Sequence, residues 1–251
     1  MLEVSGLAHS FGGVRALQEV SFRAQPGEVT GVIGPNGAGK STLLSCLSGW
    51  VKPDLGAATF NGDQLLGQAP TDLAARGVIR TFQNLELLEE SSVAENIALG
   101  TRRTASAGLL AAIVRGSAVR AQERRQRDTV TGAAERLGIT TLLDVPAGEL
   151  SYGQRKQVEM ARAWAAMPQL LLLDEPAAGL DDRERRALAH VIRQMADDGA
   201  TVLLIEHDID MVMSLCSHLV VLDFGSVISS GSPADVRRDP RVVQAYLGGA
   251  A

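Results

Sequence analysis

The sequence predicts an α/β fold organised around a phosphate-binding loop, and three observations support this prediction. Residues 34–42 fit the pattern G-x-x-x-x-G-K-[ST]. The apolar run 29–33 precedes them, and leucines within 43–47 follow at the spacing of one helix face. Other short apolar runs, such as 170–173, have the length of strands buried in a parallel sheet. Strand, glycine-rich loop and helix are therefore expected to form one unit of that sheet.

The residue types of this loop suit a phosphate group. Its glycines allow successive backbone N–H groups to turn inward, and the following helix adds the positive end of its dipole. Lys40 would reach the β- and γ-phosphates, and the Ser41 hydroxyl would ligate Mg²⁺. The alternative is a glycine-rich turn that merely packs a helix on a sheet, which the complete pattern disfavours. The residues expected to bind nucleotide here are Gly34, Asn36, Gly37, Ala38, Gly39, Lys40, Ser41 and Thr42.

Composition predicts one large globular domain, or a core with a smaller subdomain, because the 251 residues are 45% apolar and 21% charged. The net charge of −5 argues against an overall nucleic-acid binder, although local basic patches are compatible with it. The start of the chain has no signal-peptide pattern, and no apolar run reaches the ~18 residues that would span a bilayer. Cys46 and Cys216 both lie in apolar helical contexts, so buried thiols in a reducing compartment are expected.

Alternation and turn signals place the first elements. Phe11 lies on a loop before the phosphate-loop strand, where it would either stack on a base or fill the core, and position alone favours the core. Thr71 is expected to cap a short helix that ends at Gly77, and Gln83 is expected to end a strand. The pattern Ser-x-x-Glu at 92–95 is a capping box that begins a helix through Leu99. The predicted strands are 2–7, 20–24, 29–33, 57–62 and 78–83.

Residues 101–128 are strongly basic, with seven arginines against only Glu123 and Asp128. One hypothesis is that they contact anionic headgroups or a partner protein. The simpler interpretation is a solvated helical insert, and the sequence favours it.

Two acidic residues follow the apolar strand 170–173. Because open α/β sheets bind ligands at the carboxyl ends of their strands, Asp174 is expected to meet the Mg²⁺ held by Ser41. Glu175 could orient or deprotonate a water molecule. Before this strand, Ser151 and Gln154 form a second capping box, which begins a long helix.

The last third of the chain predicts a helix, a buried strand, a hairpin and a final helix. Asp181 or Asp182 is expected to cap the helix that ends near Gly199. The strand 201–205 is followed by His207. A hairpin around residues 224–225 then leads to a last helix that starts at 232–235 with proline in its first turn.

The order and spacing of these segments resemble the ATP-binding subunit of ABC transporters over essentially the whole chain. The resemblance rests on residues 34–42, Gln83, 150–154, 170–175 and His207. It implies the ABC ATPase fold, a RecA-like P-loop core with an antiparallel β subdomain and an α-helical subdomain inserted at about residues 86–160. Residues 1–251 would form a single ATP-binding domain, and the cofactors would be ATP and Mg²⁺.

The resemblance also implies roles for individual residues. Phe11 would stack on adenine, which reverses the expectation drawn from its position. Gln83 would sense Mg²⁺ and the transmembrane partner, Glu175 would be the catalytic base, and His207 would contact the γ-phosphate. Asp181 would belong to the loop that crosses between two subunits.

The segment 150–154 would complete the site of a second subunit. Ser151, Gly153 and Gln154 lie at the start of a helix, whose unpaired N–H groups and dipole suit a γ-phosphate. Tyr152 departs from the commonest Leu-Ser-Gly-Gly-Gln form, and its side chain must point away from the phosphate.

In this departure the chain resembles one subgroup, the ATP-binding subunits of branched-chain amino acid importers. Residues 77–84, the insert 101–128 and the tail 239–248 support the same assignment. The resemblance implies three partners: a second, identical or paralogous, ATP-binding subunit, transmembrane permease subunits, and indirectly a periplasmic or extracellular solute-binding protein. It also implies a peripheral location at the cytoplasmic face of the inner membrane.

Three alternatives follow from relatives of this pattern. Close relatives import urea or short amides. Soluble ABC ATPases of translation or DNA repair usually carry two cassettes or a long coiled-coil insert, which this chain lacks. A GTPase would need an Asn-Lys-x-Asp segment, and none is present.

Overall fold

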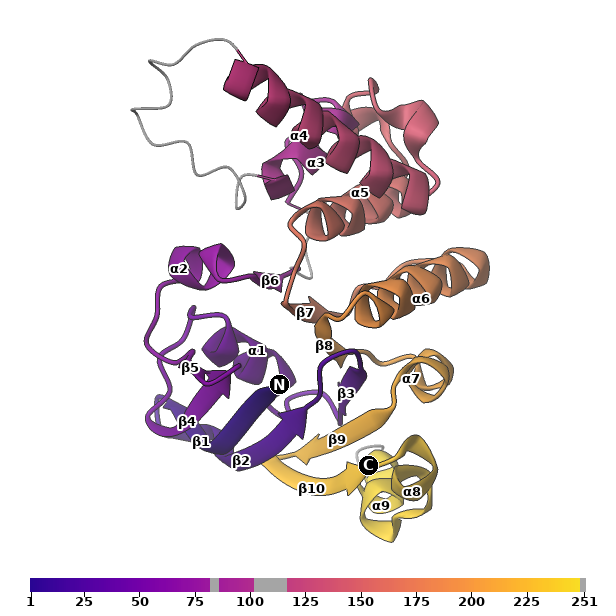
Figure 1. Cartoon of the computed structure of the whole chain (residues 1–251). Coiled ribbons are helices and arrows are strands. Elements are labelled where there is room, and N and C mark those ends of the chain that lie inside the picture. The colour runs from indigo at the N-terminus through magenta and orange to yellow at the C-terminus, as the bar shows by residue number, and fades with distance from the viewer. Residues whose placement is uncertain (82–85, 102–116, 249–251) are drawn as a thin grey trace.

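The computed structural model describes residues 1–81, 86–101 and 117–248, and in these ranges the strands form two sheets (Figure 1). The first sheet is antiparallel, with strand order β2-β1-β4-β5. Its strands are β1 (Leu2–Phe11), β2 (Val14–Ala24), β4 (Leu55–Phe60) and β5 (Asp63–Gln64).

The second sheet has the order β10-β9-β3-β8-β7-β6 and is parallel from β9 to β6, while β10 pairs with β9 in the antiparallel sense. Because the parallel strands run in one direction, the carboxyl ends of β3, β7 and β8 lie at one edge. The strands are β3 (Val29–Ile33), β6 (Val78–Arg80), β7 (Leu170–Asp174), β8 (Thr201–Ile205), β9 (His218–Asp223) and β10 (Ser226–Gly231).

The helices divide into those that cover the sheets and a separate group. The separate group stands at the top of Figure 1, where α3, α4 and α5 pack against one another. These three are α3 (Val93–Gly100), α4 (Ser117–Arg136) and α5 (Tyr152–Ala165), and short 3₁₀ turns lie at Thr140–Leu142 and Ala147–Glu149. The others are α1 (Lys40–Leu47), α2 (Pro70–Ala75), α6 (Asp182–Asp197), α7 (Ile209–Leu215), α8 (Pro233–Arg238) and α9 (Pro240–Gly248).

The central strands are buried on both faces, which explains their continuous apolar runs. Alternate residues of a strand point to opposite faces. In β7, Leu171 and Leu173 therefore join one core cluster with α5 and α6, whereas Leu170 and Leu172 join another with α1. The sheet is thus held between two apolar layers, and polar side chains are left for the strand ends.

Most predicted elements are confirmed, including the strands at 29–33 and 201–205, the hairpin and all three capped helices at 92, 151 and 181. Thr71 as a helix cap is wrong, because Pro70 occupies the first helical position and Ala69 is the N-cap residue. The helix from Pro233 is not the last, since α9 follows it.

The structure also differs from the sequence analysis in several short elements. The strand predicted over 78–83 ends at Arg80, and Thr81 is described outside it. The elements β5 and α7 were not predicted. The division of the chain at about residues 86 and 160 stays a prediction, and α5 runs on to Ala165. Within the described ranges, none of the helices combines the length and apolar character needed to cross a bilayer.

Candidate active site

The phosphate-binding loop joins β3 to α1 at the carboxyl edge of the large sheet. Gly39 is the N-cap residue of α1 with φ of 100°, in the left-handed region that favours glycine. A Cβ atom there would lie 2.3 Å from the carbonyl oxygen of Ala16, so only glycine fits. Asn36, Gly37 and Ser41 are exposed at this edge. The loop therefore offers backbone N–H groups and one hydroxyl to a ligand.

Lys40 is buried within its own loop. Its Nζ atom donates hydrogen bonds to the carbonyl oxygens of Gly34 at 2.7 Å and Pro35 at 2.9 Å. Burial lowers the pKa of Lys40, and the nearby charges of Glu175 and Asp174 oppose that shift. The ammonium group is thus held beside both acidic residues, at the point where phosphate charge would be neutralised.

The remaining loop residues lie as the pattern requires. Gly34 has φ of 151° and Gly37 has φ of 80°. Ala38 is buried, and its carbonyl oxygen accepts a hydrogen bond from Gly225 N–H at 3.1 Å. Thr42 is half-buried and is the third residue of α1.

Asp174 ends β7, one strand away from the phosphate-loop strand, with β8 between them. Its Oδ2 atom lies 3.0 Å from Nη2 of Arg80. Its Oδ1 atom is buried and has no hydrogen-bond partner within the described part of the chain. Because a buried carboxylate oxygen without a partner is costly, this atom fits a position that meets a cation or its bound water.

Glu175 and His207 meet at the ends of neighbouring strands. Nε2 of His207 lies 2.6 Å from Oε1 of Glu175. Glu175 has φ of 50°, a conformation that few residues other than glycine adopt and that accompanies functional sites. The pair is partly exposed, so the carboxylate is accessible from the phosphate-loop edge.

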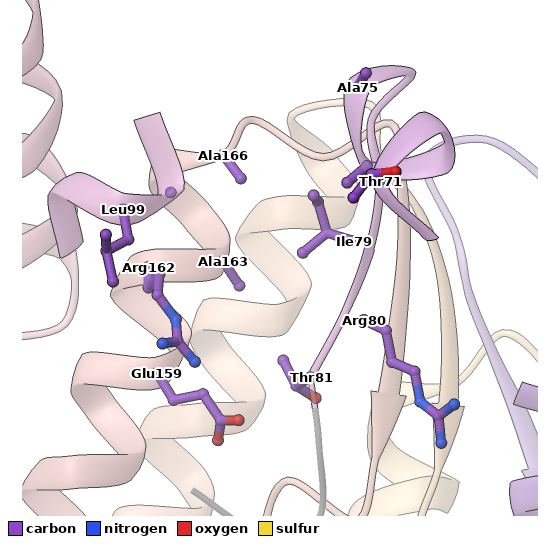
Figure 2. A pocket seen from close by; sticks show the side chains of 12 residues that line it. Thr71, Ala75, Ile79, Arg80, Thr81, Leu99, Glu159, Arg162, Ala163 and Ala166 are labelled. Atoms are coloured by element: carbon purple, nitrogen blue, oxygen red, sulfur yellow. The ribbon is translucent and has the colours of Figure 1, made fainter. Parts of the chain in front are cut away.

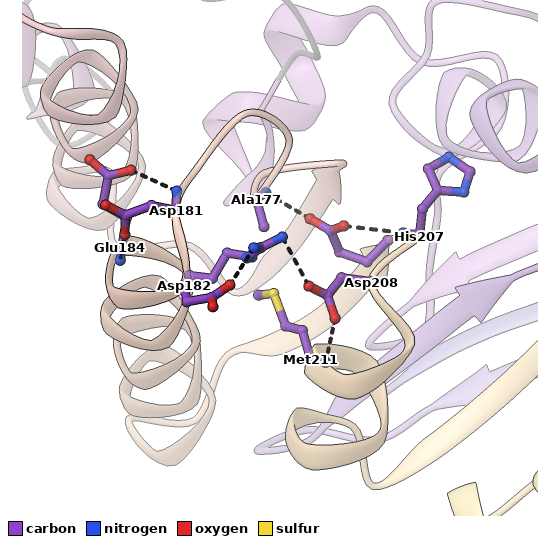
Figure 3. A network of polar contacts seen from close by, with 9 residues as sticks. Ala177, Asp181, Asp182, Glu184, His207, Asp208 and Met211 are labelled. Carbon is purple, nitrogen blue, oxygen red and sulfur yellow. Dashed lines mark hydrogen bonds and ion pairs between the residues drawn. The ribbon is translucent and has the colours of Figure 1, made fainter.

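Glu206, which the sequence analysis missed, links this pair to the loop after β7. Its carboxylate accepts hydrogen bonds from Ala177 N–H at 2.7 Å and His207 N–H at 3.1 Å. Figure 3 shows these bonds, with the His207 imidazole directed away from Asp208. Burial raises the pKa of Glu206, against the effect of its backbone hydrogen bonds. The only sequence signal was its place between a buried strand and His207.

Two capping boxes shape the segments that would face a second subunit. The Ser151 hydroxyl accepts a hydrogen bond from Gln154 N–H at 3.3 Å, and Gln154 Oε1 accepts one from Ser151 N–H at 2.9 Å. Asp181 and Glu184 make the same reciprocal contacts at 2.8 and 3.0 Å. Asp181, and not Asp182, therefore caps α6.

The two capped segments touch each other within one chain. A Cβ atom on Gly153 would lie 1.9 Å from Oε1 of Glu184, and one on Gly179 would lie 2.9 Å from the ring of Tyr152. Tyr152 is half-exposed, and its ring packs beside Gly179. The segment 150–154 thereby packs against the loop that precedes α6 and against the first turn of α6.

The structure does not bring all predicted site residues together. Figure 1 shows α5, which begins after Ser151, well apart from α1 and β3. Phe11 ends β1, exposes 51% of its surface, and makes an edge contact with the ring of His9, with the ring centroids 4.4 Å apart. The exposed ring is available to a base and does not fill the core. Gln83 lies outside the described residues.

The C-terminal helix adds one contact that the sequence analysis did not anticipate. Burial raises the pKa of Tyr246 on α9, and the nearby backbone of Gly34 opposes that shift. The tail thus packs against the start of the phosphate loop.

Comparison with known proteins identifies the family of this chain. Residues 17–178 match the ABC transporter family, and residues 226–251 match a family described as branched-chain amino acid ATP-binding cassette transporter. The chain is 38% identical to the high-affinity branched-chain amino acid transport ATP-binding protein BraF of Pseudomonas aeruginosa, over 99% of this chain and 98% of that protein. It is 35% identical to LivG of Escherichia coli K12 over the same shares.

Solved structures show the same architecture. An ATP-binding cassette of an ABC transporter in its ADP conformation has a TM-score of 0.85 at 32% identity, over 99% of this chain and 98% of that one. A nucleotide-free cassette has a TM-score of 0.84 at 32% identity, over 98% of each chain. The predicted ABC ATPase fold is confirmed. The chain therefore belongs to the ABC transporter family, among the ATP-binding proteins of branched-chain amino acid transporters.

Proposed function

We propose that this chain is the ATP-hydrolysing subunit of an importer for branched-chain or other hydrophobic amino acids. The observation that carries the proposal is the separation of the phosphate loop from the capped helix start at Ser151, which would be the two halves of one phosphate site. The phosphate loop, Asp174, Glu175 and His207 share the carboxyl edge of one sheet. The second half, at Ser151, stands on a different group of helices.

The first half would hold ATP and Mg²⁺ through its own polar groups. Lys40 and the loop N–H groups suit the phosphates, and Phe11 offers a ring to adenine. Ser41, Asp174 and Gln83 would hold Mg²⁺, and the orphaned Oδ1 of Asp174 supports that fit. When bound, Mg²⁺ neutralises charge on the phosphates.

Glu175 would act as the general base toward the attacking water. Its hydrogen bond to His207 fixes the direction of the carboxylate. His207 and Gln83 would hold the γ-phosphate end, and hydrolysis would yield ADP and phosphate. Because such transfer needs mainly positioning and charge neutralisation, the loss of any one of these contacts should be severe.

The second half would act on a neighbouring chain. Ser151, Gly153 and Gln154 would meet the γ-phosphate bound to another copy or to a paralogue, and the loop ending at Asp181 would cross to that chain. The first N–H groups of α5 favour an anion, which supports this role.

A groove between α2, β6, α3 and α5 would receive a cytoplasmic segment of the permease (Figure 2). Its volume is about 470 Å³, and its lining is mostly apolar, including Ile79, Leu99 and Ala163. Arg80, which pairs with Asp174, and Thr81, two residues before Gln83, both line it, so a docked segment would lie near the proposed metal site. This arrangement would place the chain at the cytoplasmic face of the membrane.

The amino-acid substrate is supported by the names of full-length relatives, which favour it over urea or short amides. In this architecture the solute is recognised elsewhere, by the permease and indirectly by a periplasmic or extracellular binding protein. No nucleic acid is expected to bind.

The test is recovery of partners from detergent-solubilised membranes of the source cell, with this chain as bait and ATP and Mg²⁺ present. We expect multi-span permease subunits. Ala75→Trp, at an exposed position lining the groove, should reduce their recovery. Ala234→Trp, at an exposed position of another short helix, is the control. Recovery of only soluble or ribosomal partners would overturn the transport assignment.

A further inference from the structure

Arg80, a residue to which no role has been given so far, lies between the two groups proposed to bind Mg²⁺. It is the last residue of β6, and its side chain is 11% exposed. Its Nη2 atom lies 3.0 Å from Oδ2 of Asp174, whose side chain is 5% exposed. Because both groups are almost out of water, this ion pair is screened far less than a surface pair.

The same guanidinium also binds the helix that follows the phosphate loop. Nη1 of Arg80 donates hydrogen bonds to the hydroxyls of Ser45 at 3.1 Å and Ser48 at 3.0 Å. The Ser45 hydroxyl in turn donates to the carbonyl oxygen of Ser41 at 2.7 Å. A continuous chain of polar contacts therefore joins Asp174 to the backbone of Ser41.

The geometry leaves one carboxylate oxygen for another ligand. Arg80 binds Oδ2, whereas Oδ1 of Asp174 is buried without a hydrogen-bond partner in the described part of the chain. A planar guanidinium can bind a carboxylate on one nitrogen and two hydroxyls on the other in a fixed arrangement, which a lysine ammonium cannot reproduce. The contact thus orients the carboxylate as well as pairing its charge.

The position of Arg80 in the strand explains why it reaches this site. Neighbouring side chains of a strand point to opposite faces. Figure 2 shows Ile79 and Thr81 directed toward α5, and Arg80 directed to the other side of β6. Arg80 thus points away from α5 and toward Asp174, although it also lines the groove.

We propose that Arg80 is a positioning residue that fixes Asp174 and the first turn of α1 relative to each other, and thereby sets the affinity of the site for Mg²⁺. The inference rests on the proposed function, because Ser41 and Asp174 are metal-binding residues only within it.

The test uses the full chain with Mn²⁺ as a spectroscopic probe, titrated by electron paramagnetic resonance in the presence of ADP. We expect Arg80→Met to weaken Mn²⁺ binding about tenfold or more, in the range of a lost charge-assisted contact. Arg80→Lys should recover only part of that loss. Binding of ADP in EDTA should stay close to that of the unchanged protein.

Two further variants separate positioning from folding. Ser45→Ala keeps the ion pair but breaks the link to Ser41, so it should fold and still weaken Mn²⁺ binding severalfold. If Arg80→Met fails to fold, Mn²⁺ binding by Ser45→Ala tests the positioning role of Arg80 instead. Arg136→Met removes an arginine that pairs with Asp198 at 3.4 Å outside the site, and it should leave Mn²⁺ binding unchanged.

Three results would overturn the inference. Tighter Mn²⁺ binding by Arg80→Met would mean that repulsion between the two cations is the main effect of Arg80. Equal binding by Ser45→Ala and the unchanged protein would remove the link through α1. A purely structural role would follow if Arg80→Met weakened Mn²⁺ binding and metal-free ADP binding equally, and if Arg80→Lys recovered neither. Failure of the unchanged protein to bind Mn²⁺ with ADP would instead contradict the proposed function.

Discussion

At the scale of single residues, Glu206 shows how a buried acid can organise a site without touching its ligand. Its carboxylate accepts hydrogen bonds from the backbone N–H groups of His207 and of Ala177, two residues after Glu175. The contact with Ala177 is not visible in the sequence, because Ala177 and Glu206 are 29 positions apart. Sequence patterns reveal neighbours along a helix or strand, whereas this contact depends on how β7 and β8 pair.

Glu206 predicts a particular dependence of stability on pH. Burial raises the pKa of Glu206 above the ordinary 4.5. Between pH 4.5 and the pKa of Glu206 in the folded state, the folded state therefore binds more protons than the unfolded state. The contribution of Glu206 is therefore fully present below about pH 4.5 and is lost as pH rises through the folded pKa. In urea unfolding at several pH values, Glu206→Gln should lack this decline.

The control for Glu206 is Glu90→Gln, at an exposed position. Its unfolding free energy should follow that of the unchanged protein at every pH. If the unfolding free energies of Glu206→Gln and of the unchanged protein changed with pH in parallel, this would contradict the assigned effect of burial on Glu206.

The two cysteines also behave as their surroundings dictate. Both are buried and free, as the sequence predicted, and burial raises the pKa of Cys46 to about 11 and of Cys216 to about 12. At pH 8 the reactive thiolate is therefore about one part in a thousand or less. We expect almost no reaction of the native protein with Ellman's reagent, and two thiols per chain in denaturant. Rapid labelling of the native protein at pH 8 would contradict this placement.

At the scale of elements, the sequence was enough to predict features that depend on residues close together in the chain. The capping boxes at Ser92, Ser151 and Asp181 need only residues three positions apart. The buried strands were found from continuous apolar runs. Thr71 was misassigned because Pro70, which fits the first helical turn, outweighs a threonine cap. The short α7 was missed although Asp208 caps it, because seven residues give too weak a periodicity.

The contact between α5 and α6 predicts a coupled effect of two substitutions. Gly153→Ala would push its new methyl group against Glu184, whose carboxylate caps α6 through Asp181 N–H. Gly153→Ala and Glu184→Ala should therefore each lower the free energy of unfolding by about 1 kcal/mol, the usual value of a cap.

The double variant tests whether these effects share one cause. It should lose little more than either single variant, because the same cap is lost once. Urea unfolding measures all three. Fully additive losses would contradict the contact between Gly153 and Glu184.

At the scale of the whole molecule, the order of strands assembles the site. Residues 34–42, Asp174 and His207 are far apart in sequence, but β3, β8 and β7 lie side by side and end at one edge. The motifs predicted which residues gather there. They could not predict the bridge from Arg80 to Asp174, because a polar pair 94 positions apart leaves no periodic signal.

Under the proposed function, the same architecture leaves one chain incomplete as an ATPase. Ser151 begins a helix that packs with α3 and α4, apart from the phosphate loop of its own chain. In the proposed function, another chain supplies this helix end and thereby closes the phosphate site. The account therefore predicts an association that depends on nucleotide.

The most direct test is the molar mass of Glu175→Gln in solution, measured by light scattering with and without ATP and Mg²⁺. The account predicts a monomer without nucleotide and a dimer with it. ATP hydrolysis should fall about 100-fold or more, because the general base is lost while the binding groups remain. A monomer at saturating ATP, together with undiminished hydrolysis, would contradict both the shared site and the role of Glu175.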